Sequence, residues 1–301
     1  MTGPITPDSQ HRGLVSRLPR RLRGFALLAR FDRPIGWWLL FWPGAWAVAL
    51  AGGAVARWEL LAWLLVGSIA MRGAGCVYND IVDRDLDARV ARTAARPIPS
   101  GLVSVRAALA WLVALSLVGL VVLLQLRSLA ALVAMASLAL VALYPFMKRI
   151  TWWPQAWLGL VFSWGALVGW VEVAGGFGLA AAALYAGSVA WVIGYDTIYA
   201  LQDVDDDALI GVRSSARALG GRVRGGVAGF YAVAVGGWAV AFWQVRPDPL
   251  ALVALLPVAM HLGWQVATLR PADGRNALER FRSNRTAGLL LFLACLVVGT
   301  A

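Results

Sequence analysis

Two short tracts hold most of the carboxylates in this sequence. The chain has 16 aspartates and glutamates, and nine of them lie between residues 80 and 87 or between residues 196 and 207. Carboxylates crowded in this way repel one another unless a cation offsets their charge. Mg²⁺ prefers oxygen ligands and usually binds through one or two carboxylates together with substrate phosphates. We therefore predict that two Mg²⁺ ions hold a diphosphate here. The nine residues are Asp80, Asp83, Asp85, Asp87, Asp196, Asp203, Asp205, Asp206 and Asp207.

The spacing of the first tract places its polar groups on one side of a helix. Asn79, Asp83 and Asp87 recur every four residues, and Asp80 lies beside them. A helix that continues through residue 87 therefore presents several oxygen ligands in one direction.

The second tract repeats this arrangement. Asp203 and Asp207 are four residues apart, and Asp196 precedes Asp203 by seven residues. This spacing again predicts one shared helix face. The alternative for both tracts is a set of solvated charges at helix ends.

Basic side chains suited to phosphate lie near the tracts. Arginine binds phosphate through two parallel hydrogen bonds, whereas lysine acts as a point charge. The single lysine of the chain, Lys148, follows an apolar segment. The alternative is that these side chains anchor lipid headgroups. The candidates are Arg92, Arg96 and Lys148, followed by Arg149 and Arg213.

Arg72 lies seven residues before Asn79, two helical turns deeper in an apolar segment. An arginine at that depth costs free energy unless it is paired. It could bind a substrate carboxylate, or it could form an internal ion pair with an aspartate of the tract. The residues alone leave both readings open.

The elements that position these side chains are apolar helices. Of 301 residues, 60% are hydrophobic and 14% are charged, and the mean hydropathy is +0.70. These values exclude a disordered chain and a disulfide scaffold, and they predict an all-α polytopic membrane protein. We expect one domain over residues 1–301, with a flexible cytoplasmic segment at residues 1–24. Nine segments could span a membrane: 36–52, 59–78, 105–125, 129–147, 154–172, 180–200, 225–244, 250–269 and 286–301.

The basic residues predict the orientation of these spans. Of 27 arginines and lysines, 24 lie within residues 1–36, 72–106, 148–149, 201–224 and 270–285, which alternate with the connections that hold Arg57, Arg127 and Arg246. By the positive-inside rule, the N-terminus and both acidic tracts face the cytoplasm. An odd number of spans then places Ala301 on the opposite side. The net charge of +11 is therefore an orientation signal and not a nucleic-acid footprint.

Tryptophan is abundant, with 16 residues. Many lie near the ends of the predicted spans, where indole rings favour the membrane interface. We expect most of them to form an interfacial belt, although a few could line an apolar cavity. The tryptophans near span ends are Trp37, Trp38, Trp42, Trp46, Trp152, Trp153 and Trp157.

The motifs resemble those of the UbiA-type intramembrane prenyltransferase superfamily. Asn79 to Asp87 match its N-D-x-x-D-x-x-x-D motif, Tyr144 and Lys148 match Y-x-x-x-K, and Asp203 and Asp207 match D-x-x-x-D. Longer stretches are similar to the 4-hydroxybenzoate polyprenyltransferase branch. These stretches are residues 30–36, 71–76, 144–149, 154–155, 195–207 and 211–215, whereas residues 92–97 are typical of the whole superfamily. Arg33 and Arg213 stand where the branch usually has lysine, so the charge is kept.

The resemblance implies a nine-helix fold around a central cavity that is capped on the cytoplasmic side. It also implies transfer of a polyprenyl group from polyprenyl diphosphate to the ring carbon ortho to the hydroxyl of 4-hydroxybenzoate, with Mg²⁺, in ubiquinone synthesis at a bacterial inner membrane. Arg72 and Asn79 correspond to residues associated with the aromatic acceptor. Asp196 is a candidate base, and the metal ligands would be Asp80, Asp83, Asp87, Asp203 and Asp207. Further substrate-binding candidates are Arg92, Arg96, Tyr144, Arg149, Tyr199 and Arg213.

Three alternatives remain. The first is the same chemistry with another acceptor: a naphthoate, homogentisate, haem or chlorophyllide. The second is a transporter that couples ions through its carboxylates. The third is a structural membrane protein without catalysis, which would leave the paired acidic tracts unexplained.

Overall fold

Helices account for all the regular secondary structure in the computed structural model, which describes residues 14–88, 93–204 and 211–300. Within that part of the chain, eight helices are long and apolar enough to cross a membrane, and Ile35–Leu50 is a shorter apolar helix. Each of the nine predicted spans coincides with one of these helical segments. The prediction of an all-helical, multi-pass membrane protein is confirmed.

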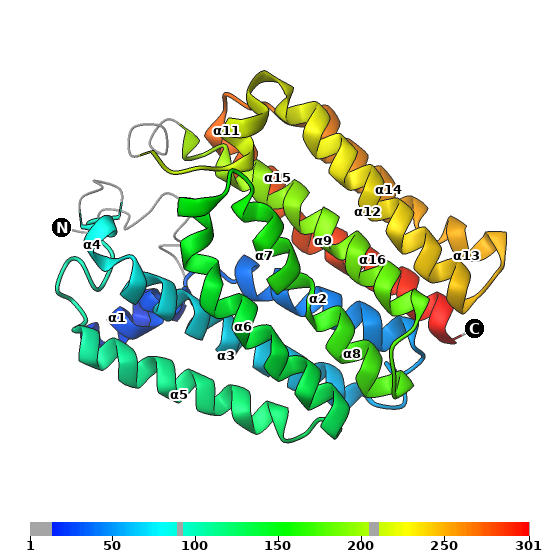
Figure 1. Cartoon of the computed structure of the whole chain (residues 1–301), viewed down its shortest axis with the longest axis horizontal. Helices are drawn as coiled ribbons and strands as arrows, with labels where there is room; N and C mark the ends of the chain where they lie inside the picture. The colour runs from blue at the N-terminus through cyan, green and yellow to red at the C-terminus, as the bar shows by residue number, and fades with distance from the viewer. Residues whose placement is uncertain (1–13, 89–92, 205–210, 301) are drawn as a thin grey trace. The chain divides into compact units, whose positions relative to one another are not determined.

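Two compact units form within the chain, Met1–Trp38 with Leu65–Gln125 and Leu39–Leu64 with Leu126–Ala301 (Figure 1). The single domain expected over residues 1–301 stays a prediction. Part of the N-terminal segment that we expected to be flexible is helical, because η1 covers Leu14–Arg17 and α1 begins at Arg20.

In the first unit, the short helix α1 packs against apolar spans. Leu28 and Ala29, at the end of α1, share a buried cluster with Val77 and Leu115. Ser104 begins the span α5, because its side chain accepts a hydrogen bond from the backbone N–H of Ala107. The elements of this unit are η1 (Leu14–Arg17), α1 (Arg20–Leu28), the start of α2 (Ile35–Leu50), most of α3 (Trp58–Val82), α4 (Arg84–Asp87) and α5 (Val105–Leu123).

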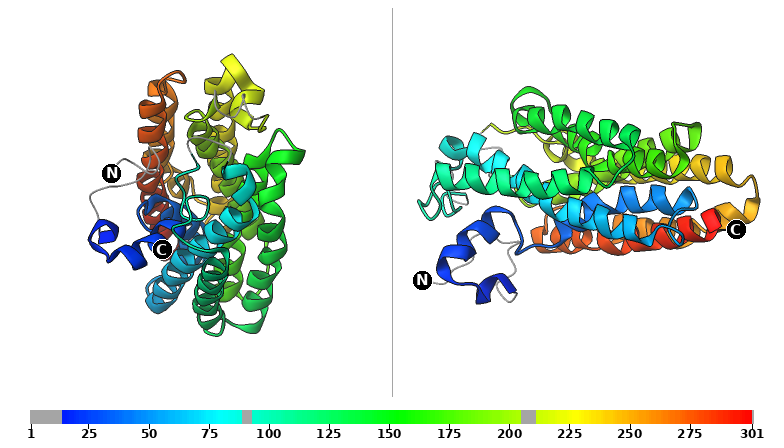
Figure 2. Two further views of the ribbon diagram at one scale, coloured as in Figure 1. Left: turned by 90° about the vertical axis from the view of Figure 1, so that its left-hand side faces the viewer. Right: turned by 90° about the horizontal axis from the view of Figure 1, so that it is seen from below.

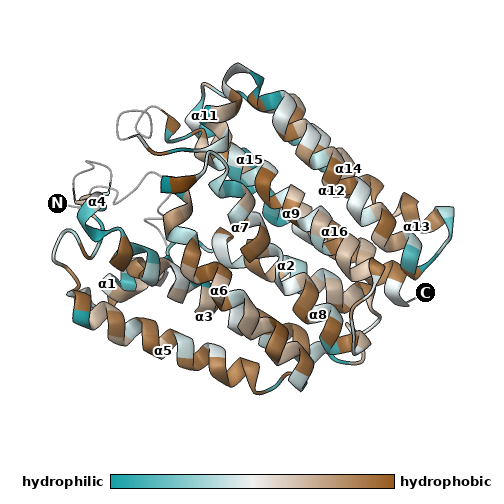
Figure 3. Cartoon of the chain, viewed as in Figure 1, coloured by the Kyte–Doolittle hydropathy of each residue, from teal (hydrophilic) through white to brown (hydrophobic). Residues whose placement is uncertain are grey.

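Helix α5 keeps an apolar stripe exposed. Leu109, Val113, Leu117 and Val121 recur every four residues and are between 46% and 57% exposed. Figure 3 shows this helix as hydrophobic along its length, whereas hydrophilic residues gather at α4. A stripe of this kind is what lipid chains cover in a membrane-spanning helix.

The second unit is built around α9, which packs against α7 and α12. Its long helices run along a common direction in views turned by 90° from each other (Figures 1 and 2). Two predicted spans are each divided, one after α7 and one after α13. The helices of this unit, besides the remainders of α2 and α3, are α6 (Ser128–Ile150), α7 (Pro154–Ser163), α8 (Gly165–Ala174), α9 (Leu179–Ala200), α11 (Ser215–Leu219), η2 (Gly220–Arg222), α12 (Val223–Val245), α13 (Pro249–Val253), α14 (Leu256–Thr268), α15 (Gly274–Arg282) and α16 (Asn284–Thr300).

Aromatic rings fill the core of the second unit. Trp46, Trp191 and Trp238 are fully buried, and the ring centroids of Trp46 and Trp191 are 4.9 Å apart. The indole N–H of Trp46 donates to the carbonyl of Gly288 at 2.8 Å. The expectation of an interfacial belt is therefore wrong for Trp46, and also for Trp42, which is 5% exposed. The reason is that this part of α2 lies inside the helical unit, so its tryptophans pack against other helices.

Glycines let α2 and α8 approach closely. A Cβ atom added at Gly169 would lie 2.6 Å from the carbonyl oxygen of Gly44, closer than real contacts allow. Close helix approach through small residues is a common packing mode in membranes, where van der Waals contact replaces the hydrophobic effect.

A buried glutamate ties together two connections of the second unit. Glu172 is fully buried, and its carboxylate accepts hydrogen bonds from the guanidinium of Arg57 at 2.7 Å and from the backbone N–H of Arg127 at 2.7 Å. Arg57 and Arg127 are two of the three basic residues outside the basic connections. Their contacts with Glu172 show that both have a structural role.

Candidate active site

The first acidic tract continues the helical path of α3. The backbone N–H of Asp83 donates to the carbonyl of Asn79 at 2.9 Å, and that of Asp87 donates to Asp83 at 2.8 Å. These two bonds carry the chain from α3 into α4, so the predicted shared face of Asn79, Asp83 and Asp87 is confirmed. Asp80, Asp83 and Asp87 are at most 6% exposed, whereas the side chain of Asp85 is 80% exposed.

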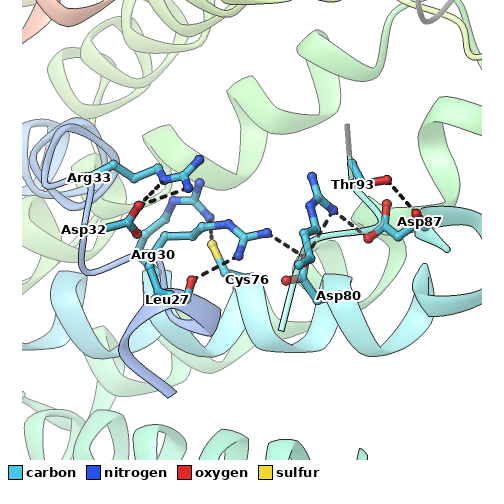
Figure 4. A network of polar contacts seen from close by, with 10 residues as sticks. Leu27, Arg30, Asp32, Arg33, Cys76, Asp80, Asp87 and Thr93 are labelled. Carbon is cyan, nitrogen blue, oxygen red and sulfur yellow. Dashed lines mark hydrogen bonds and ion pairs between the residues drawn. The ribbon is translucent and has the colours of Figure 1, made fainter. Parts of the chain in front are cut away.

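Two arginines offset the repulsion within this tract (Figure 4). The Oδ1 atom of Asp80 accepts hydrogen bonds from Arg30 at 2.9 Å and from Arg96 at 3.3 Å. Arg96 also donates to Oδ2 of Asp87 at 2.6 Å. Burial raises the pKa of the Asp87 carboxyl, and the neighbouring Arg96 acts in the opposite direction.

The remaining oxygens of the tract suit a hard cation. The Oδ2 atom of Asp80 is buried and accepts no hydrogen bond from the described residues. Among those residues, no three histidine, cysteine, aspartate or glutamate side chains form a metal site by themselves. The Oδ2 atom of Asp80 is therefore an oxygen donor of the kind that fits Mg²⁺, which usually takes further oxygens from substrate phosphates.

Arg72 lies on α3, half-buried, on the side of the helix that faces Gly36. A Cβ atom at Gly36 would lie 2.9 Å from Nε of Arg72, so glycine leaves the space that the guanidinium occupies. The Nη1 atom of Arg72 donates to the sulfur of Cys76, which is buried one turn further along α3. The contact with Cys76 thus holds the side chain of Arg72 along α3, the helix that also carries Asn79.

The second acidic tract departs from the predicted helix. Helix α9 ends at Ala200, and the next three residues bond to carbonyls three residues back, with Asp203 reaching Ala200 at 3.2 Å. These tighter turns interrupt the α-helix between Asp196 and Asp203, and the shared helix face expected for these two residues stays a prediction. Both residues are half-buried. Asp205, Asp206, Asp207 and Arg92 lie outside the described residues.

Tyr199 lies on the last turn of α9, and a ring from α15 packs against it. The centroid of Phe281 is 4.5 Å from that of Tyr199 and 5.8 Å from that of Tyr195. Asp273 caps the start of α15, because its carboxylate accepts from two backbone N–H groups of the first turn. Helix α15 thus supports the end of α9 that carries Asp196.

Tyr144 and Lys148 lie four residues apart near the end of α6, so their side chains leave the helix in similar directions. Both are half-buried, and Arg149 is exposed. The helix ends at Ile150, two residues after Lys148.

The segment that follows the second tract is tied to three helices. The backbone N–H of Ser215 donates to Oε1 of Gln155 at 2.9 Å, and the hydroxyls of Ser215 and Thr197 are 2.6 Å apart. Arg213 donates through its backbone N–H to the carbonyl of Lys148 at 3.4 Å and through Nη1 to that of Ile150 at 2.8 Å. The first residues described after the second tract are therefore held against α6, α7 and α9.

We expected no roles for Gln155, Thr197 and Ser215, which lie within longer stretches that resemble the family. All three are buried polar residues in or beside apolar segments. Buried polar side chains nearly always have hydrogen-bond partners, so their position in apolar segments was the signal for such a tie.

The chain belongs to the UbiA prenyltransferase family, whose model matches residues 40–296. Among its relatives, the Drosophila melanogaster protein is 42% identical over 303 residues, which cover 99% of this chain and 76% of that protein. The Homo sapiens relative is 39% identical, and the match covers 96% of this chain and 81% of that protein. The Arabidopsis thaliana relative is 40% identical, and the match covers 91% of this chain and 68% of that protein. All three are named mitochondrial 4-hydroxybenzoate polyprenyltransferases.

Solved structures share the fold. A UbiA homologue from Aeropyrum pernix K1 has a TM-score of 0.68 and 25% identity, covering 86% of this chain and 97% of its own. A UbiA homologue from Archaeoglobus fulgidus, solved with GPP and Mg²⁺, has a TM-score of 0.67 at 15% identity and covers 92% of this chain and all of its own.

Proposed function

We propose that this protein transfers a polyprenyl group from polyprenyl diphosphate to the ring carbon ortho to the hydroxyl of 4-hydroxybenzoate and releases diphosphate. One observation carries the proposal. Relatives named for this activity match between 91% and 99% of the chain at 39–42% identity. The buried aspartates of the first tract supply the kind of site that the reaction needs.

We assign Mg²⁺ binding to Asp80, Asp83, Asp87, Asp203 and Asp207, with two ions bridging the diphosphate. Support comes from the orphaned oxygen of Asp80 and from the Archaeoglobus fulgidus homologue that was solved with GPP and Mg²⁺. Bound Mg²⁺ supplies Lewis-acid stabilisation of the charge on the leaving group.

The cations of the chain bind the phosphate groups in this proposal. Arginine and lysine side chains add stabilisation where charge develops on the departing oxygen. Arg96 is the best placed of those described, because its guanidinium already lies between two carboxylates of the first tract. The residues assigned to phosphate are Arg92, Arg96, Lys148, Arg149 and Arg213.

The acceptor binds through Arg72 and Asn79. The guanidinium of Arg72 holds the carboxylate of 4-hydroxybenzoate, which orients the ring carbon toward the allylic carbon. Tyr144 and Tyr199 contact the substrates. As the allylic C–O bond breaks, the ring carbon attacks that carbon, and Asp196 takes the ring proton. The apolar helices keep water away from the positive charge that develops on the allylic carbon.

The multi-pass chain works in a membrane, and we assign the N-terminus and both acidic tracts to the cytoplasmic side of a bacterial inner membrane. The proposal rests on 24 of the 27 basic residues lying on that set of connections. The relatives named above are mitochondrial. Ubiquinone synthesis is the pathway that this product serves.

The test uses membranes that contain the protein, labelled 4-hydroxybenzoate, geranyl diphosphate and Mg²⁺. We expect lipid-soluble label that EDTA abolishes. Parallel reactions replace 4-hydroxybenzoate with labelled 1,4-dihydroxy-2-naphthoate or homogentisate. Label from one of these acceptors but not from 4-hydroxybenzoate would reject the acceptor and retain the prenyltransferase class. Absence of label from every acceptor, with the protein shown to be folded, would reject the class.

A further inference from the structure

Arg30 has an unusual backbone and a fixed side chain. It lies between α1 and α2, and among the described residues it is the one non-glycine residue with a positive φ, at 58°. This left-handed conformation costs free energy in a residue with a Cβ atom, so it persists where surrounding contacts enforce it. Here Nη1 of Arg30 donates to the carbonyl of Leu27 at 3.1 Å, and Nη2 donates to Asp80 at 2.9 Å.

Arg30 is the first member of a row of alternating charges in the first unit. The row runs from Arg30 to Asp80, Arg96 and Asp87, and all four side chains are at most 18% exposed (Figure 4). Two arginines share Oδ1 of Asp80, and the contact from Arg30 is the shorter, at 2.9 Å against 3.3 Å from Arg96. Asp80 therefore has two counter-ions, and Arg96 has two carboxylates.

The two arginines differ in what they can do. Arg30 is anchored to the end of α1 through the carbonyl of Leu27, so its guanidinium stays at Asp80. A buried carboxylate that loses all its counter-ions is strongly destabilising. If Arg96 turned from Asp80 to a phosphate, Asp80 would keep Arg30, and no bare charge would be left behind.

We propose that Arg30 is the standing counter-ion of Asp80, a positioning residue that frees Arg96 to bind the diphosphate. This inference rests on the proposed function, because it assigns Arg96 to the phosphate groups. Arg30 itself touches no substrate in this account. Its role is to hold the charge and the orientation of Asp80 while Arg96 changes partner.

Removing Arg30 should therefore weaken diphosphate binding. In Arg30→Gln, Arg96 is the remaining arginine at Asp80, so its transfer to phosphate would leave bound Mg²⁺ alone to offset that buried carboxylate. We expect the apparent affinity for pyrophosphate with Mg²⁺ to fall about tenfold or more. Arg30→Lys keeps the charge, and we expect its affinity to stay within about threefold of the wild type.

The experiment measures the thermal shift of the purified full chain during a pyrophosphate titration at fixed Mg²⁺. Arg23→Gln is the matched control, because Arg23 lies on α1, is exposed and donates to the backbone carbonyls of Ser16 and Leu18. We expect Arg23→Gln to titrate like the wild type. The inference is overturned if Arg30→Gln also titrates like the wild type, or if the control loses as much affinity. A wild-type protein that pyrophosphate and Mg²⁺ do not stabilise would instead overturn the proposed function.

A second comparison decides the matter if Arg30→Gln does not fold. Arg96→Gln should still fold without ligand, because Arg30 still pairs with Asp80. With ligand, Arg96→Gln should bind pyrophosphate worse than Arg30→Lys does. Equal binding by Arg96→Gln and Arg30→Lys would contradict the role of standing counter-ion.

Discussion

The two acidic tracts have similar residue types and spacing but different local structures. In the first, helical hydrogen bonds continue from Asn79 to Asp87, and the three aspartates on that path are nearly fully buried. In the second, α9 ends at Ala200, the chain tightens, and Asp203 is half-buried. The difference shows that similar residue types and spacing do not guarantee the same local structure.

Order is supplied by different means in the two regions. Ion pairs with Arg30 and Arg96 fix the first tract from within. The second is bracketed by α9 on one side and, on the other, by the hydrogen bonds that hold Arg213 and Ser215. We infer that the first tract is pre-organised for its ligand, and that these hydrogen bonds hold the chain that follows the second.

The largest expected effect on stability comes from a substitution in the first tract, and the matching substitution in the second tract should have a smaller one. Asp80→Asn removes the carboxylate shared by two buried arginines, so we expect it to lower the free energy of unfolding by about 3–5 kcal/mol. Asp203→Asn changes a half-buried residue beyond the end of α9, and we expect a loss of about 1 kcal/mol or less. Thermal denaturation of the metal-free protein in detergent measures both. Equal losses would mean that the tracts are not differently organised.

Arg72 tests whether the helix that carries the first tract also binds the acceptor. Hydrogen bonds to charged groups contribute about 1.5–3 kcal/mol, so Arg72→Ala should raise the KM for 4-hydroxybenzoate by about 10- to 100-fold. The KM for the prenyl diphosphate should change little. Steady-state kinetics with each substrate varied in turn make this measurement. A rise confined to the prenyl diphosphate would show that Arg72 serves the phosphate groups.

Gln155 tests the outside support of the second tract. Gln155→Ala leaves the buried N–H of Ser215 without its acceptor, at a cost of about 1–3 kcal/mol. We expect a lower melting temperature and a higher KM for the prenyl diphosphate. The control is Gln125→Ala, since Gln125 donates to the carbonyl of Val121 at an exposed site and should change neither quantity. If the two variants behave alike, the tie to Ser215 does not support the site.

Much of this arrangement could be predicted from the sequence, for reasons that the structure makes plain. Runs of apolar residues located every span, including the end of α9 at residue 200, and the four-residue spacing of Asn79, Asp83 and Asp87 described their shared face. The tighter turns that follow Ala200 could not be predicted, because they leave no pattern in the residue types. The pair of Arg30 and Asp80 joins residues 50 positions apart, and no local pattern indicates such a contact. The predicted interfacial position of Trp46 was wrong for a related reason. A tryptophan in an apolar segment gives the same sequence pattern whether it lies at a membrane interface or in a core.

The central claim is that two differently organised tracts serve one reaction, and a single set of assays tests it. Product formation from labelled 4-hydroxybenzoate, geranyl diphosphate and Mg²⁺ is measured for Asp83→Ala, Asp203→Ala and the exposed control Asp85→Ala. We predict that both Asp83→Ala and Asp203→Ala lower the rate by about 10²–10³-fold, as loss of a charge-stabilising group does, and that Asp85→Ala stays near the wild type. A wild-type rate for either Asp83→Ala or Asp203→Ala, in protein shown to be folded, would contradict the claim.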